Sequence, residues 1–486
     1  MNPVPTSPAA EVGRAQSFPG ARSALVLLLL INLFNYLDRY VLAAVVKPIK
    51  STFFGEGGVA SQDGVLMMVM KWFEHSLGFK PEDALIGLLG TAFMLVYMVG
   101  APLFARLAEQ RSRWLIVGVG VILWSLASGA SGLAVSFVAL LLTRCLVGVG
   151  EAAYGPVAPA VIADYYPVRM RGQVLAWFYM AIPVGSALGY VFGDWVTGSL
   201  FAGRPEAWRW AFYLVVVPGL VLGVWSLCRR DPPRGQADLS QGEKSTKVGR
   251  RDYLILLRTP SFVLCTLGMA AMTFAIGGIS FWTPYYLEGR PGAPANSTRI
   301  FGAITAVAGL VATLLGGLAA DKLRRRFPGS YFLVSGAAMV VGFPVFLAML
   351  YLNVSFAWLW VLIFLTCFCL FFNTGPTNTI IANVTHPSLR AAGFALCIFV
   401  IHALGDVISP VIIGLLNDYF HDMNKSFLVV GLAFLIAGGL WLWGTRYLAR
   451  DTALAPLRLA AVPRGKTEAE LAPAVFAPPG SPPRRP

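Results

Sequence analysis

The chain has 486 residues, of which 57% are hydrophobic and 13% charged, and its formal net charge is +14. A soluble domain carries about 25% charged residues, so about half of that share excludes an ordinary water-facing surface. The basic residues stand between apolar runs rather than along one face, which excludes a nucleic-acid-binding protein. The six cysteines form no Cys-x-x-Cys pair, so neither a metal site nor a disulfide framework is expected.

Apolar runs long enough to cross a bilayer recur from one end of the chain to the other. A run of about 18 or more apolar residues spans the hydrocarbon core as a helix. A polar segment, residues 229–258, divides these runs into two groups of six. We therefore predict an all-α polytopic membrane protein with twelve transmembrane helices in two pseudo-symmetric six-helix halves. The predicted helices cover residues 24–47, 84–104, 114–135, 137–163, 171–196, 208–228, 261–287, 299–320, 330–351, 355–383, 390–416 and 426–447.

The segments between and beyond the helices define the predicted domains. They are an N-terminal tail (1–22), a six-helix bundle (23–228), a linker (229–258), a second six-helix bundle (259–448) and a C-terminal tail (449–486). The C-terminal tail is rich in Pro and Ala, and we expect it to be disordered. Lys and Arg are about three times as frequent on the side of the termini and linker, which predicts that this side is cytoplasmic.

The connection between the first two helices, residues 47–83, is long. Its stretch from Val65 to Phe79 is apolar but contains Lys71, Glu74 and His75. Such a stretch is either a helix lying on the outer membrane interface or a lid, and the sequence does not choose between them.

Six ionisable residues fall well inside the predicted helices, namely Asp38, Arg39, Arg144, Glu151, His402 and Asp406. A charge at the bilayer centre costs about 2.5–3.5 kcal/mol or more on insertion scales, so each residue marks a candidate site. Helices 1 and 4 run in opposite directions, and a rise of about 1.5 Å per residue gives Asp38 and Arg144 matching depths. Glu151 lies two turns further along the same face as Arg144.

These depths predict a proton path between helices 1 and 4. Our hypothesis is that Asp38 and Glu151 carry the proton. Arg39 and Arg144 then either hold the carboxylates or bind an anionic head group. The alternative is a static buried salt bridge that ties the two helices together.

His402 and Asp406 are predicted to take part in proton coupling as well. They are four residues apart and therefore share a helical face. An imidazole beside a carboxylate can titrate near neutral pH. The alternatives are an ordinary core histidine and an Asp406 that caps the backbone freed by Pro410.

A further set of residues is predicted to line a central cavity. Aromatic side chains suit an acyl chain, amides inside helices add polar contacts, and proline bends a helix. For any single member, contact with another helix or with lipid is the alternative. The set is Asn35, Tyr36, Tyr154, Tyr179, Pro183, Phe274, Trp282 and Asn373.

The two halves carry related sequences. Gly155-Pro156 with Ile162-Ala163-Asp164 has a counterpart in Gly375-Pro376 with Ile381-Ala382-Asn383. Repeated halves are common in secondary transporters, whose substrate site lies between them near the midplane. Related loops also follow helices 2 and 8. They predict a cytoplasmic gate, with ordinary positive-inside charge as the alternative, and its members are Glu109, Arg113, Asp321, Arg324 and Arg325.

Two motifs resemble signatures of the major facilitator superfamily. They are the loop Gly317–Arg326 and the helix 4 stretch Arg144–Ala152, although the first-half copy of the loop departs from the pattern at Ala105, Glu109 and Ser112. The resemblance sharpens to the Spinster family of lipid-like transporters. The segments that carry it are Asn35–Arg39, Gly148–Ala152, Ala181–Tyr190, Gly375-Pro376, Ile401–Asp406 and Ser409-Pro410.

This resemblance implies the major facilitator fold and proton-linked movement of lysophospholipid- or sphingoid-like amphiphiles. Protons would be the coupling ion, with no other cofactor. The expected partners are an amphipathic small molecule and the lipid bilayer, with no nucleic acid, and we expect a monomer in the inner membrane of a bacterium. The connection at residues 47–83 is longer than the family pattern.

Other function classes fit the sequence less well. No His-Glu-x-x-His, Gly-x-Ser-x-Gly or clustered metal-ligand motif occurs, so we expect neither an enzyme nor catalytic or metal-binding residues. The sequence has no Walker A motif for ATP-driven pumping, and charges of mixed sign do not form the rings of a channel. Within transporters, the alternative is a proton-coupled exporter or importer of another small organic molecule, such as a drug or sugar.

Overall fold

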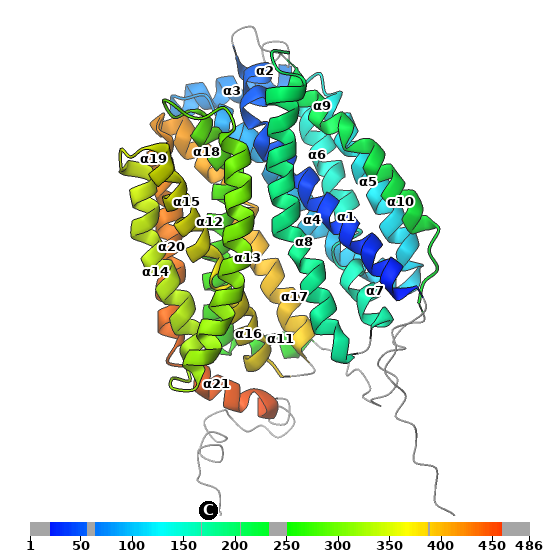
Figure 1. Ribbon diagram of the computed structural model, residues 1–486, viewed down its shortest axis with the longest axis vertical. Coiled ribbons are helices and arrows are strands. Elements are labelled where there is room, and N and C mark those ends of the chain that lie inside the picture. Colours follow the sequence, from blue (N-terminus) through cyan, green and yellow to red (C-terminus); the bar gives the residue numbers. More distant parts are fainter. Residues whose placement is uncertain are drawn as a thin grey trace, which may run out of the picture.

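The computed structural model describes residues 20–55, 64–166, 168–204, 206–232, 250–386 and 389–458. Within these ranges the chain is helical and contains no strand. Twelve helices are long and apolar enough to cross a membrane, and most of them lie side by side along the long axis of the molecule (Figure 1). The predicted all-α fold with twelve spans is confirmed.

The N-terminal half holds six spans, three of which are divided into two elements. The helices are α1 (Ala21–Ala44), α4 (Glu82–Gln110), α5 (Arg113–Gly132), α6 (Phe137–Ala152) with α7 (Val157–Tyr165), α8 (Val168–Trp195) with the π-helical turn η2 (Val196–Leu200), and α9 (Ala207–Leu214) with α10 (Val216–Leu227). Two helices that do not span, α2 (Val46–Phe54) and α3 (Gly64–Leu77), separate α1 from α4. They lie together at one end of the bundle (Figure 1).

The C-terminal half repeats this arrangement. Its spans are α12 (Pro260–Glu288), α13 (Ser297–Arg324), α14 (Ser330–Tyr351), α15 (Phe356–Phe371) with α16 (Thr374–Val384), α17 (Arg390–Ile401) with the π-helical turn η4 (His402–Asp406) and α18 (Ser409–Phe420), and α20 (Leu428–Gly444). Short helices flank them, namely α11 (Arg250–Leu257), α19 (Met423–Ser426), α21 (Leu448–Leu454) and the 3-10 turn η5 (Ala455–Leu457). The span formed by α6 and α7 and the span formed by α15 and α16 therefore break at equivalent places, near Pro156 and Pro376.

The domain limits differ from the prediction at the ends of the second half. Helix α11 occupies the last part of the predicted linker. The expectation of disorder from residue 449 is wrong for residues 449–458, because Asp451 is fully buried and accepts a hydrogen bond from the backbone N–H of Ser261 at 2.8 Å. Arg458 donates to Asp451 at 3.2 Å and to the carbonyl oxygen of Val384 at 2.8 Å. The tails at 1–19 and 459–486 and the linker residues 233–249 lie outside the described residues.

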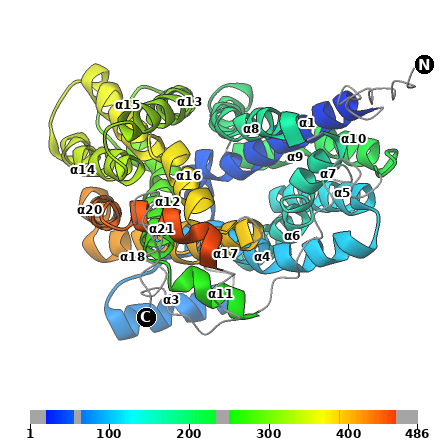
Figure 2. The ribbon, with the colours of Figure 1, turned by 90° about the horizontal axis from the view of Figure 1, so that it is seen from below.

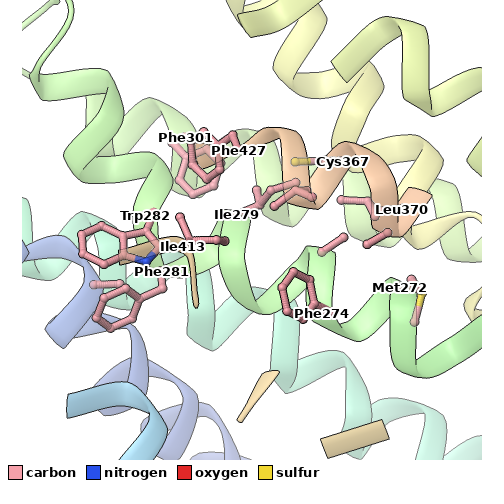
Figure 3. Packing of buried hydrophobic residues seen from close by; sticks show 14 of the residues in the cluster. Met272, Phe274, Ile279, Phe281, Trp282, Phe301, Cys367, Leu370, Ile413 and Phe427 are labelled. Atoms are coloured by element: carbon pink, nitrogen blue, oxygen red, sulfur yellow. The ribbon is translucent and has the colours of Figure 1, made fainter. Parts of the chain in front are cut away.

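The two halves pack closely at the end that carries α2. A side chain at Gly414 of α18 would meet the carbonyl oxygen of Asp83 at 2.3 Å, and one at Gly87 of α4 would meet that of Pro410 at 2.4 Å. These glycines let the backbones of α4 and α18 approach. Below this crossing, Ile413 lies beside Trp282 and Phe281 of α12 in the core of the second half (Figure 3).

Candidate functional site: buried charges in the spans

An ion pair between α1 and α6 lies at the heart of the first half. Arg39 donates from Nη2 to Oε2 of Glu151 at 2.7 Å and from Nε to the same oxygen at 3.0 Å. The Glu151 side chain is fully buried, and 15% of the Arg39 side chain is exposed. Arg39, the residue after Asp38, thus makes the contact that joins α1 to α6.

Three aromatic rings surround the Arg39 guanidinium. Its Cζ lies 4.9 Å from the ring centroid of Tyr36, 5.0 Å from that of Phe93 and 5.1 Å from that of Tyr97. A cation over an aromatic face is attracted by the ring quadrupole, most strongly where water is excluded. The pair is thus held by ring faces on one side and by the carboxylate on the other. Sequence reasoning missed Phe93 and Tyr97, whose only signal is their i, i+4 spacing on α4.

A second pair of opposite charges lies close by without forming an ion pair. Asp38 is fully buried and accepts a hydrogen bond from Ser128 of α5 at 2.5 Å. Arg144 of α6 is also buried, and its Nε and Nη1 have no hydrogen-bond partner among the described residues. The Arg144 guanidinium lies 5.7 Å from the ring of Phe93. Phe93 therefore contacts both arginines and separates the two pairs.

Glycine sets the spacing between α6 and its neighbours. A side chain at Gly148 would meet the carbonyl oxygen of Phe93 at 2.5 Å, and one at Gly150 would meet the backbone nitrogen of Trp124 at 2.7 Å. Small residues let spans approach closely in a membrane. The Gly148-x-Gly150 motif thus packs α6, and with it Glu151, closely against α4 and α5.

In the second half, His402 and Asp406 form the predicted pair. Nδ1 of His402 lies 2.9 Å from Oδ1 and 3.1 Å from Oδ2 of Asp406. Both belong to η4, and single π-helical turns inside spans are frequent at functional sites. The ring of Tyr97 meets the His402 ring edge to face at a centroid distance of 6.3 Å. Tyr97 therefore contacts the charged groups of both halves.

The predicted cavity residues occupy several environments. Tyr36 belongs to the Arg39 cluster, Asn35 is buried one turn before Arg39, and Tyr179 is half-exposed. Pro183 lies opposite Gly309 of α13. The other four members are buried. Phe274 packs in the core, and the other three donate hydrogen bonds to backbone carbonyl oxygens. These bonds run from Tyr154 to Leu28 at 2.7 Å, from Trp282 to Pro410 at 2.9 Å and from Asn373 to Leu370 at 2.7 Å. Substrate contact by this set stays a prediction.

The predicted cytoplasmic gate residues contact partners in their own halves. Arg113 forms an ion pair with Asp164 of α7 and donates to the carbonyl oxygen of Pro232 at 2.9 Å. In the second half, the Tyr331 hydroxyl donates to Asp321 at 2.7 Å, and Arg324 donates to Tyr331 at 3.2 Å. Glu109 and Arg325 are exposed at helix ends. Their role as a gate stays a prediction.

At the α2 end, one polar contact between the halves involves Asp418 of α18. Its two carboxylate oxygens accept hydrogen bonds from the backbone N–H groups of Asp83 at 2.9 Å and Ala84 at 2.8 Å. A carboxylate there satisfies donors that the first turn of a helix leaves unpaired. Asp418 thus caps α4 from the opposite half.

The side chain of Asp83 adds two hydrogen bonds to the same contact. Its Oδ1 accepts from Lys50 of α2 at 2.6 Å, and its Oδ2 accepts from Asn417 at 2.6 Å. Burial disfavours the Lys50 ammonium, but the Asp83 carboxylate outweighs this effect and raises the pKa of Lys50. Sequence reasoning missed Asp83 and Asp418, because acids at span ends look like ordinary loop charges.

Another polar contact joins α8 to the other half. Asp194 of α8 forms an ion pair with Arg299 of α13, and Arg299 also donates to the Ser199 hydroxyl at 2.8 Å. The Tyr190 hydroxyl donates to the carbonyl oxygen of Ser280 of α12 at 2.6 Å. We call the two contacts together the seam. It closes the α2 end through α4–α18 on one side and α8–α13 on the other.

Comparison with known proteins places this arrangement in a family. Residues 28–405 match the model of the Major Facilitator Superfamily. Protein spinster homolog 3 of Danio rerio is 34% identical, over 83% of this chain and 78% of its own length. A sphingosine-1-phosphate transporter, SPNS2 of Danio rerio, is 31% identical over 83% of this chain and 79% of its own.

The fold also agrees with a solved structure. A bacterial homologue of the human lysosomal transporter Spinster, in an inward-facing and occupied conformation, superposes with a TM-score of 0.72 at 23% identity, covering 89% of this chain and 99% of that one. The buried charges of α1 and α6 thus lie in a transporter fold. The chain belongs to the Spinster family of the major facilitator superfamily.

Proposed function

We propose that the protein is a proton-coupled secondary transporter that moves lysophospholipid- or sphingoid-like amphiphiles by alternating access. The observation that carries the proposal is the buried Arg39–Glu151 ion pair. A charge inside a membrane protein is costly and typically serves a proton, ion or substrate pathway. The family supports transport, and a sphingosine-1-phosphate transporter among the relatives supports the substrate class, whereas proton coupling rests on this geometry.

The proton step follows from the partners of Glu151. The carboxylate accepts both hydrogen bonds from Arg39 through Oε2, while Oε1 has no partner among the described residues. A proton on Glu151 would neutralise it and leave the Arg39 charge unbalanced. The nearest neutral support for that charge is the aromatic cluster of Tyr36, Phe93 and Tyr97. Tyr97 also contacts His402, so a movement of Arg39 against the Tyr97 ring would be transmitted to His402 in the second half.

Asp38 and Arg144 supply a second charge change on the same helices. Among the described residues the Ser128 hydroxyl is the hydrogen-bond donor to Asp38, so a proton on this carboxylate would break no ion pair. Arg144 keeps two unpartnered donors. Guanidinium donors of this kind suit a phosphate, which binds arginine in a fork geometry. We assign Arg144 to an anionic head group.

The conformation fits alternating access with the α2 end outside. The excess of Lys and Arg on the side of the termini supports this orientation. With this orientation the seam would lie on the outer side, as alternating access expects for an inward-facing state. The similar bacterial protein was solved in an inward-facing conformation as well, which supports the same reading.

Substrate uptake into proteoliposomes tests the proposal. The purified protein would be supplied with labelled sphingosine-1-phosphate, lysophosphatidylcholine or xylose, each with and without a pH gradient. We expect gradient-dependent movement of a lysolipid or sphingoid substrate and none of xylose. Movement of xylose alone would support the sugar alternative. Transport of the lipid at the same rate with and without the gradient would contradict proton coupling.

A further inference from the structure

Helix α3 lies across the end of the bundle rather than along it. In the view from below, spans such as α8, α13, α14 and α20 are seen end on, whereas α3 is seen along its length at the edge of the molecule (Figure 2). Only residues 78–81 separate α3 from the first turn of α4. The axis of α3 therefore runs across the direction of these spans, at the level where α4 begins.

One face of α3 is attached to the body of the protein. Leu66 is buried and Met70 packs against the same core cluster. At the other end of the helix, the Phe73 ring contacts Phe79 at a centroid distance of 6.3 Å, and Phe79 contacts Tyr419 of α18 at 5.9 Å. These contacts fix the rotation of α3 about its own axis.

A second apolar face points away from the protein. The exposed fractions of Val65, Met68 and Trp72 are 62%, 72% and 60%. Their i, i+3, i+7 spacing places them in one stripe, because a helix turns by about 100° per residue. Three exposed apolar side chains in a fixed stripe indicate contact with an apolar partner.

The third face of α3 is polar. Lys71, Glu74 and His75 are exposed, and at about 100° per residue they lie on the arc between the apolar stripe and the protein-facing side, with His75 next to Met68. The helix thus has one face toward protein, one apolar face and one face suited to water. That division matches a helix at the boundary between acyl chains and water, where the apolar stripe sinks in and the charges stay out.

The neighbouring surface shows what covers the apolar stripe. Tyr419 and Phe420, at the end of the membrane span that α18 completes, are exposed beside α3. Trp and Tyr are enriched where spans meet the membrane surface. The stripe with Trp72 therefore continues the lipid-facing surface of the spans. We propose that α3 is an interfacial helix, with Val65, Met68 and Trp72 in the lipid leaflet at the α2 end.

Spin-label accessibility tests the proposal independently of transport. Cys228 and Cys145, which are not fully buried, would be replaced by serine, and Met68→Cys or Lys71→Cys would be labelled in protein reconstituted into liposomes. Leu432→Cys on the exposed side of α20 provides a reference within the bilayer. Collision with oxygen reports acyl chains, and collision with a nickel chelate reports water.

We expect position 68 to resemble position 432, with an oxygen-to-nickel ratio several-fold above that of position 71. A nickel accessibility at position 68 equal to that at position 71 would mean that the stripe stands in water. Shielding of positions 68 and 71 from both reagents would mean that protein covers the helix, as in a lid. Either of these results would overturn the proposal.

Discussion

Two regions of this protein use buried charges in different ways. In the first half, Arg39 and Glu151 pair between α1 and α6, so the pair remains within one rigid bundle. At the seam, Asp418 caps α4 and Asp194 pairs with Arg299, so those charges join the two halves. Charges of the first kind can change the internal balance of one half, whereas charges of the second kind set which end of the molecule is closed. Substitutions of the central pair should therefore change stability and transport, whereas substitutions at the seam should change which end of the molecule is closed.

The largest effect is expected from breaking the central pair. Arg39→Leu leaves Glu151 buried without its partner, and such a loss costs about 3–5 kcal/mol in buried pairs. We expect a clearly lower melting temperature in detergent together with loss of transport. In the double variant Arg39→Leu with Glu151→Leu, most of the stability should return, but transport should not. Restored transport would show that the pair is only structural.

The next effect is expected from separating α4 and α18. Gly414→Ala would place a Cβ 2.3 Å from the carbonyl oxygen of Asp83, and overpacking of this kind costs about 1–3 kcal/mol. We expect the closed seam to open, seen as a longer distance between spin labels placed at the α2 ends of the halves. Gly439→Ala on α20 is the matched control, because nothing lies within 4 Å of its Cβ. If the spin-label distance in Gly414→Ala equals that in the unaltered protein, the close approach of α4 and α18 does not hold the seam closed.

A smaller shift is expected from weakening the cap on α4. Asp418→Asn keeps one accepting oxygen but loses the charge and one of two backbone hydrogen bonds, and loss of a cap costs about 0.5–2 kcal/mol. We expect a partial shift away from the closed seam in the same distance measurement, with the Arg39–Glu151 pair unaffected. A shift as large as that of Gly414→Ala would show that the carboxylate, rather than packing, holds the seam.

The smallest effect is expected at the other side of the seam. About a third of the Arg299 side chain is exposed, and ion pairs at such positions contribute about 0–1 kcal/mol. Arg299→Gln should change the distance distribution little at high salt and slightly at low salt. A loss of closure comparable to the Asp418 variant would move the main contact of the seam to α8 and α13.

The sequence predicted those features that depend on one helix or on depth. Length and hydropathy gave the twelve spans, and the i, i+4 spacing gave the His402–Asp406 pair. Matching depths placed Asp38 level with Arg144, whereas the ion pair that joins helix 1 to helix 4 is Arg39–Glu151. The same argument left open which residue faces Glu151, because the rotation of a helix is set by its packing. For α1 that packing is against α8, where Gly185 and Gly189 lie against the backbone carbonyl oxygens of Leu33 and Leu37.

Features that depend on packing between distant segments could not be predicted. Phe93 and Tyr97 carry no charge that would set them apart from other aromatic residues in a span. Asp418 is a cap only because α18 crosses the start of α4, and composition does not show such a crossing. Asp451 is buried because α21 docks on the ends of α12 and α16, although its neighbours in sequence resemble a polar tail.

Proton coupling through Glu151 is the claim on which the functional account depends. Glu151→Gln would be reconstituted beside Glu206→Gln, which changes an exposed loop carboxylate, and both would be assayed for gradient-driven accumulation and for exchange of labelled lysolipid at equal pH. We predict that Glu151→Gln loses gradient-driven accumulation but keeps exchange, while Glu206→Gln behaves like the unaltered protein. Gradient-driven accumulation by Glu151→Gln at the unaltered rate would contradict the account.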